Sequence, residues 1–152
     1  MANTQAFCSQ AKVDMMNGKH AMGASVARAG TTKDAYKAAL YLASATRNAA
    51  DTVYSATGEV SGTNYSAGGV AVTTGTAPTL DGTTAHFTPS ASIVFTNVTL
   101  STSFDAALIY NDTSSTDLAL SVHTFTAQTV TAGDFTLTMP TNDGTTGLVR
   151  LA

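Results

Sequence analysis

The sequence predicts a mainly β protein: an antiparallel β-sandwich of jelly-roll type, preceded by a short N-terminal helix and arm. Three observations support this prediction. Threonine is abundant, with 28 Thr and 13 Ser among 152 residues, and Thr favours strands. Short β-prone runs recur from residue 69 onward with turn residues between them. Several of these runs alternate apolar and polar side chains, as half-buried strands do.

The first segment is expected to be helical. Within residues 3–17, apolar residues recur four apart, and Asn3 or Thr4 could cap the helix. Cys8, the only cysteine, lies beside this apolar face and is expected in the core rather than as a nucleophile. A loop or extended arm follows. We therefore divide the chain into a helix and basic arm, residues 1–33, and a β-sandwich domain, residues 34–152.

The β domain is expected to open at residues 35–44, where alternation suits a strand although the alanines also suit a helix. We favour the strand because everything that follows is β-prone. Further strands are predicted at residues 69–73, 84–88, 91–100, 106–110, 118–126, 134–139 and 147–151. Turns are expected at Asp81-Gly82, Pro89, residues 111–117, Gly133 and residues 140–147.

The charges are unevenly placed. The net charge is -3, yet six of the seven Lys and Arg residues lie in the first third of the chain, and none lies between Asn48 and Val149. Such a split can orient a protein on a charged partner, although few charges can also fall unevenly by chance. Direct nucleic-acid binding by the acidic body is not expected, because neutralising phosphates needs clustered Lys and Arg.

The N-terminus lacks the pattern of a signal peptide, and no apolar run approaches the roughly 20 residues that span a bilayer. We therefore expect a protein made in a cytoplasm, with no membrane partner.

No motif points to catalysis. The Gly-rich stretch "GEVSGTNYSAGGVAV", residues 58–72, contains no Lys or Arg and leads into a strand, so its glycines are expected to shape turns rather than bind phosphate. The histidines lack metal-site spacing, and no nucleophile elbow occurs. The Asn111–Asp117 loop suits a polar hairpin turn better than a cation site. We predict no enzyme, and no catalytic, metal or cofactor-binding residues.

Five segments together resemble a group of small virion structural proteins of tailed bacteriophages. They are "MANTQAFCSQAKVDMMNGKHAM", "TTKDAYKAALYLASAT", "GEVSGTNYSAGG", "AALIYND" and "GLVRLA". The resemblance extends in order over nearly the whole chain and departs at Ala106, where the group usually has Gly. It implies a non-enzymatic virion component, assembled in the cytoplasm of a bacterial host.

Within that class, the favoured role is a capsid decoration, or cement, protein. It would form a homo-oligomer, with a trimer favoured, and bridge major capsid subunits or other virion proteins. The alternatives are a neck or tail component, such as an adaptor ring or fibre-base module, and a receptor- or carbohydrate-binding module, which the absence of Trp disfavours. The expected interface residues lie in the basic arm and in the Gly-rich loop: Lys12, Lys19, Arg28, Lys33, Asn64 and Tyr65.

Overall fold

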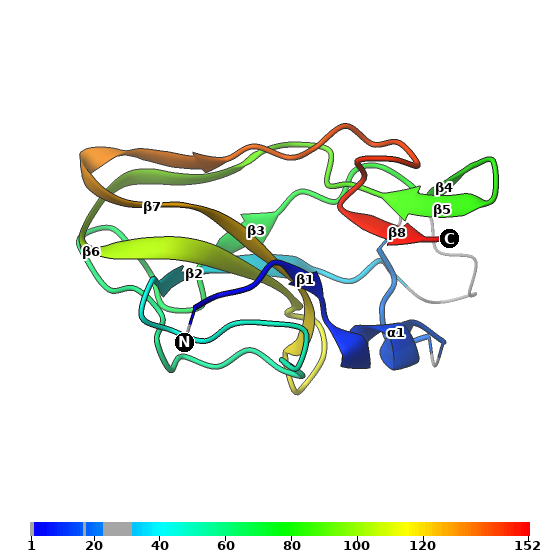
Figure 1. Cartoon of the computed structure of the whole chain (residues 1–152), viewed down its shortest axis with the longest axis horizontal. Coiled ribbons are helices and arrows are strands. Elements are labelled where there is room, and N and C mark those ends of the chain that lie inside the picture. Colours follow the sequence, from blue (N-terminus) through cyan, green and yellow to red (C-terminus); the bar gives the residue numbers. More distant parts are fainter. Residues whose placement is uncertain (1, 17, 23–31) are drawn as a thin grey trace.

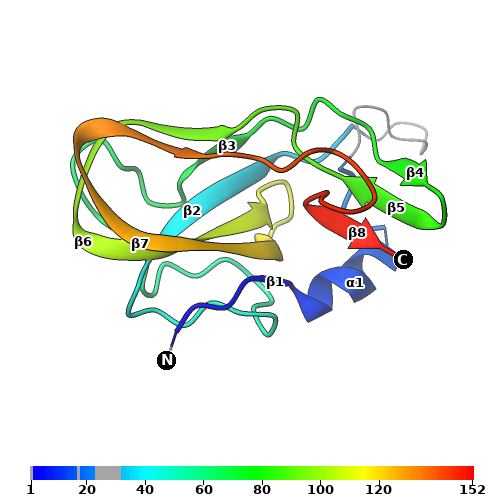
Figure 2. The same ribbon diagram turned by 45° about the horizontal axis from the view of Figure 1, so that its top comes forward.

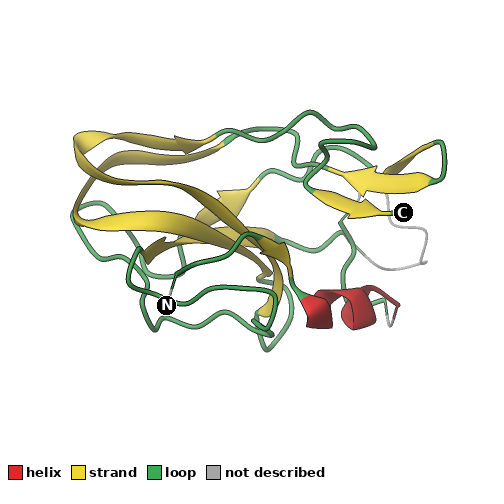
Figure 3. Cartoon of the chain, in the orientation of Figure 1, coloured by secondary structure: helices red, strands yellow, loops and turns green. Residues whose placement is uncertain are grey.

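The computed structural model describes residues 2–16, 18–22 and 32–152. Strands dominate it, and one short helix lies at one end, as Figure 3 shows. The prediction of a mainly β, antiparallel protein with a short N-terminal helix is confirmed. The finer assignment to the jelly-roll type stays a prediction.

The described strands form two sheets (Figure 1). In the larger sheet the order is β1-β7-β6-β2-β3, with bounds Ala6–Phe7, Leu118–Leu137, Ile93–Asn111, Tyr36–Leu42 and Val70–Val72. The smaller sheet has the order β4-β5-β8, with bounds Thr79–Asp81, Thr84–Phe87 and Val149–Leu151. The helix α1 spans Ser9–Met16.

A long bent hairpin of β6 and β7 is the centre of the fold. Its two strands fold back together at the left of Figures 1 and 2. The register between them shifts repeatedly from Phe95 to Ala106, and Asn97 and Ala132 take positive φ values of 50° and 45°. Bulges of this kind increase twist and bend a strand pair. One hairpin therefore supplies both layers at this end of the molecule.

Aromatic side chains fill the inside of the bend. Phe104 and Phe135 pack edge to face with ring centroids 5.1 Å apart, and Phe95 and Phe125 both contact Phe135. Phe104 is completely buried. Edge-to-face pairs are more favourable than their buried area alone suggests. The core that supports the bend is therefore aromatic, although the chain contains few aromatic residues.

The N-terminal segment differs from the expectation of one helix over residues 3–17. Residues 6–7 pair with β7 as β1, and the helix begins only at Ser9. Asn3 is not a helix cap, since its side-chain oxygen accepts from the Arg47 amide at 2.7 Å. Cys8 is fully buried, as expected, and burial raises the pKa of its thiol to about 12.

The later strands were correctly located but wrongly divided. The runs 91–100 and 106–110 belong to one strand, β6, and the runs 118–126 and 134–139 both fall largely within β7. Gly133 is not a turn, because it pairs with Val98 inside the long hairpin. The Asp81-Gly82 turn is present, and the residues before it form a strand, β4, that the sequence did not indicate.

Candidate functional site

The lysines expected at an interface lie at one end of the molecule. Lys12 is exposed on α1, Lys19 follows that helix, and Lys33 precedes β2 and donates to the carbonyl of Thr74 at 3.0 Å. Arg28 lies outside the described residues. We call the end that carries α1 and β8, on the right of Figure 1, the helical end.

Lys19 and two other basic residues of the first third are ion-paired within the chain. Lys37 Nζ lies 2.9 Å from Asp112 Oδ1, and Arg47 lies 3.5 Å from Asp51. The Arg47 guanidinium also covers the ring of Tyr41 at 4.8 Å from its centroid. These contacts lock segments of the body together, so the positive charge of the first third is only partly available to a partner.

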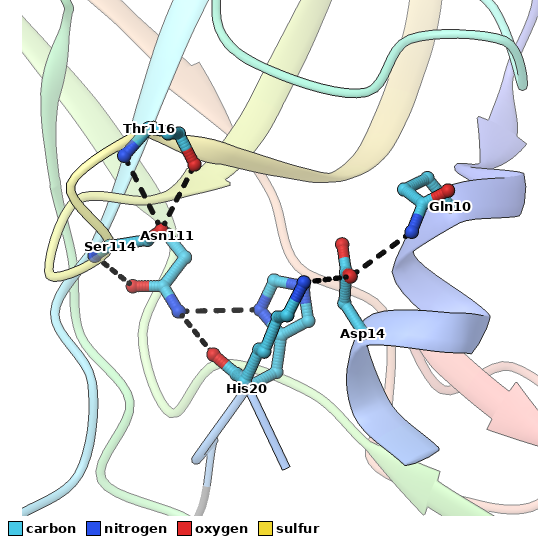
Figure 4. A network of polar contacts seen from close by, with 7 residues as sticks. Gln10, Asp14, His20, Asn111, Ser114 and Thr116 are labelled. Atoms are coloured by element: carbon cyan, nitrogen blue, oxygen red, sulfur yellow. Dashed lines mark hydrogen bonds and ion pairs between the residues drawn. The ribbon is translucent and has the colours of Figure 1, made fainter. Parts of the chain in front are cut away.

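A polar network joins the N-terminal segment to the β body (Figure 4). Asp14, on α1, accepts hydrogen bonds from Gln10 and Lys19, both at 3.1 Å. Asn111, at the end of β6, donates to the carbonyl of Lys19 at 3.0 Å and to Asp34 at 2.9 Å. The arm is thus anchored to the sheet by hydrogen bonds of buried side chains.

His20 lies in the middle of this network. Its Nδ1 is 3.2 Å from the Tyr36 hydroxyl. Burial lowers the pKa of His20, although Asp14 and Asp34 oppose this change. Burial would raise the pKa of Asp14, but hydrogen bonds from Gln10 and Lys19 outweigh it and leave that pKa below its ordinary value. The network therefore holds a neutral imidazole beside a charged carboxylate.

The Gly-rich loop is organised around the only glutamate of the chain. Glu59 accepts from the hydroxyls of Tyr54 at 2.6 Å and Tyr65 at 2.7 Å, and from the amide of Gly68 at 2.8 Å. Gly68 and Gly69 have φ values of +87° and +76°. The loop thus turns the chain between the body and β3, which agrees with the expectation that its glycines shape turns.

Tyr65 is half-buried and packs against the core, whereas Asn64 is exposed. The Tyr65 ring stacks on Phe95 at 5.8 Å, its hydroxyl accepts from the Leu40 amide at 2.9 Å, and burial raises its pKa. Asn64 donates to the carbonyl of Asn97 at 2.8 Å, which places it at the hairpin bend. Asn64 is therefore the more accessible of the two residues to a partner.

The structure does not bring the two predicted surfaces together. Lys12 and Lys19 lie at the helical end, whereas Asn64 lies at the bend of β6 and β7, which is on the left of Figure 1. The bend carries no ionisable side chain in residues 96–103 and 126–133, where Thr and Ser dominate. The two sets of predicted interface residues therefore lie at opposite ends of the molecule.

A groove that sequence reasoning missed runs between the two sheets at the helical end. It comprises two adjoining cavities of about 500 and 440 Å³ that share Gln5, His123, Leu148 and Arg150. Its sides are β1 and β8, each of which lies at the edge of its own sheet. The only sequence signal was Arg150, the single base after Arg47.

The groove is positively charged at Arg150, and His123 contributes no charge at neutral pH. His123 Nε2 lies 3.0 Å from the Ser121 hydroxyl, and burial lowers the pKa of His123 to about 4. Arg150 is exposed and donates to the carbonyl of Thr145. No Asp or Glu side chain lines either cavity. This arrangement suits an extended segment that carries an acidic side chain.

The Asn111–Asp117 loop has the geometry of a turn. Asn111 points inward and is 1% exposed, and its Oδ1 accepts from the Thr113 amide at 3.0 Å. Asp112 pairs with Lys37, and Asp117 has a φ of 50°. Across the described ranges, no three His, Cys, Asp or Glu side chains converge as a metal site requires. Likewise, no helix in the described part of the chain is long and apolar enough to cross a membrane.

Comparison of the chain with protein-family models, with curated proteins and with solved structures gives no significant match.

Proposed function

We propose that the protein is a non-enzymatic structural component of a tailed-phage virion, most specifically a capsid decoration protein that oligomerises on the outer shell. The resemblance of five sequence segments to small virion proteins supports this role. The jelly-roll assignment belongs to the same proposal, since the topology of the described strands neither requires nor excludes it.

One structural observation carries the proposal: the exposed lysines gather at one end of an elongated molecule, whereas the bend at the other end has few charges, Asp134 being the acidic residue in contact with it. Lys12, Lys19 and Lys33 lie at the helical end, whereas residues 96–103 and 126–133 at the bend carry no ionisable group. A protein with this arrangement attaches through its lysine-bearing end, where Asp14 and Asp81 offset part of the positive charge, and presents a Thr- and Ser-rich surface to solvent.

The buried polar groups also favour a structural role. The ordered clusters around Glu59 and around Asn111 join segments of the same chain through several hydrogen bonds. Such clusters specify one rigid arrangement of loops. Rigidity is what repeated, symmetric contacts on a shell require, because many weak contacts add only when each is held in place.

Charge reversal at the helical end tests this proposal. Lys12→Glu should weaken binding of the purified protein to particles that lack it, and the loss should grow as ionic strength falls. Thr102→Glu adds an acidic side chain at the bend and is the control, with attachment expected to be unchanged. The proposed orientation would be contradicted if Thr102→Glu abolished attachment and Lys12→Glu left it intact.

Deleting the N-terminal residues is a poor substitute for this test. Cys8 and Ala11 are fully buried in the main core, and residues 6–7 pair with β7. A truncated chain would lose core packing together with its charges, so failure to attach would not identify the cause.

A further inference from the structure

The smaller sheet has two edges that carry complementary groups. β4 and β8 each pair only with β5 among the described strands, and they lie on opposite sides of it (Figure 2). All three residues of β4 are exposed. Open edges of this kind are templates for pairing with another strand. The contents of the two edges indicate which strand that is.

Apolar side chains at these edges are uncovered. Leu80 in β4 is 69% exposed and Leu151 in β8 is 43% exposed. Both are opposite Ala85 in the ladder, so Leu80, Ala85 and Leu151 form one cross-strand row on one face. Within one chain β5 keeps the two leucines apart. They become neighbours only if the sheet continues from one copy into the next.

The charges of the two edges match in the same way. Asp81 is exposed on β4, and Arg150 is exposed on β8. The row Thr79, His86 and Arg150 shows that Arg150 is on the face opposite the leucines, where alternation also places Asp81. A strand β4 beside β8 therefore brings Leu80 to Leu151 and Asp81 near Arg150 at once.

Among the described strands, β8 has no partner on the side away from β5, so a further strand can pair there. Other pairings fit less well: β8 against β8 brings two Arg150 side chains together, and β4 against β4 leaves Leu151 uncovered.

We propose that β4 of one copy docks along β8 of the next copy of this chain, which makes a head-to-tail homo-oligomer whose smaller sheets form one continuous band. Contacts of this heterologous type close into rings when the rotation between copies permits. The inference rests on the homo-oligomer of the proposed function and names the surface that forms it.

Charge exchange tests the contact by sedimentation velocity over a wide range of concentrations. Asp81→Lys and Arg150→Glu should each weaken self-association by about tenfold or more. The double variant, which restores opposite charges, should return to within about threefold of the original chain. Self-association unchanged by either single variant overturns the proposal, as does a double variant no better than the singles.

An apolar pair of variants provides the second arm. Leu80→Ser should reduce self-association, whereas Val94→Ser, a matched change at a 42% exposed valine on β6, should leave it intact. Circular dichroism and melting temperature show whether each variant is folded. An unmodified chain that stays monomeric overturns the proposal, yet attachment of that monomer to particles would leave the virion role standing.

Discussion

The carboxylate of Glu59 lies 2.7 Å from the hydroxyl of Tyr65, and that hydroxyl in turn accepts from the Leu40 amide at 2.9 Å. Through this one relationship the Gly-rich loop is tied to the central strand β2. The Tyr110 hydroxyl adds a bond to the carbonyl of Gly68 at 2.8 Å. The Gly-rich loop is therefore held to the sheet by internal hydrogen bonds, although its glycines resemble those of a ligand-binding loop.

Removing the hydrogen bonds to Glu59 should lower the free energy of unfolding. Glu59→Ala leaves two tyrosine hydroxyls and the Gly68 amide without their acceptor, and we expect a loss of about 2 kcal/mol in the free energy of unfolding. Glu59→Gln keeps the shape and part of the bonding and should lose less. Urea denaturation measures both variants, and an alanine variant as stable as the original would show that these hydrogen bonds are dispensable.

Substitutions at two glycines with positive φ distinguish the cost of backbone strain from the cost of a steric clash. At Gly69 a Cβ would lie 1.8 Å from the carbonyl oxygen of Ala38, whereas at Gly82 it would meet nothing within 4 Å. Gly82→Ala should therefore cost only the left-handed backbone penalty, about 1–2 kcal/mol. Gly69→Ala must also move β2, so we expect a loss of at least about 3 kcal/mol. Equal melting temperatures for the two variants would refute this distinction.

The aromatic core of the bend should be the most sensitive part of the hairpin. Phe104→Ala removes a fully buried ring that contacts Phe125 and Phe135, with an expected cost of about 3–5 kcal/mol. Val94→Ala, at an exposed position of the same strand, should change stability by less than about 0.5 kcal/mol. Thermal unfolding, monitored by circular dichroism, compares the stability of the two variants. Similar losses of stability would show that Phe104 is not a central part of the core.

Stability should decrease as the solution becomes mildly acidic. The pKa of His123 falls to about 4 in the folded chain. Between pH 6.5 and 4, His123 is therefore protonated in the unfolded chain but neutral in the folded chain, and protonation favours unfolding. The lowered pKa of His20 acts in the same direction. One such group gives a slope of at most about 1.4 kcal/mol per pH unit between pH 6.5 and 4.

The variant His123→Gln isolates that contribution. Its unfolding free energy should depend less on pH between 6.5 and 4 than that of the original chain. NMR titration of the imidazole gives a direct reading, since His123 should stay neutral until the pH approaches 4. A midpoint near 6.5 would contradict the lowered pKa of His123.

Local patterns were sufficient to find most strands but not how they join. Strand β2 follows from the alternation of residues 35–44, and β3 and β5 follow from β-prone runs bounded by turn residues. The sequence predicted a turn at Gly133 and therefore missed the bend. In the structure, bulges near Asn97 and the positive φ of Ala132 bend the two strands while their pairing continues. Strand β1 has two residues and owes its pairing to β7 rather than to its own sequence.

The groove was beyond local reasoning for a similar physical reason. Its sides come from residues 5–7 and 148–152, at opposite ends of the chain, and only the sheet topology brings them together. Arg150 stood out in the sequence as an isolated base, but nothing near it in the chain indicated His123 or Gln5. By contrast, the turn function of the Gly-rich loop was predictable from its glycines, and its lack of any basic residue argued against phosphate binding.

The most direct test of the virion role is the copy number of this chain in purified particles, measured by quantitative mass spectrometry against the major capsid protein. The decoration proposal predicts a ratio of one per capsid subunit or a simple fraction of it, because a protein that covers the shell follows its symmetry. About a dozen copies or fewer would instead place the chain at the neck or tail. Absence from the particle would contradict the virion role altogether.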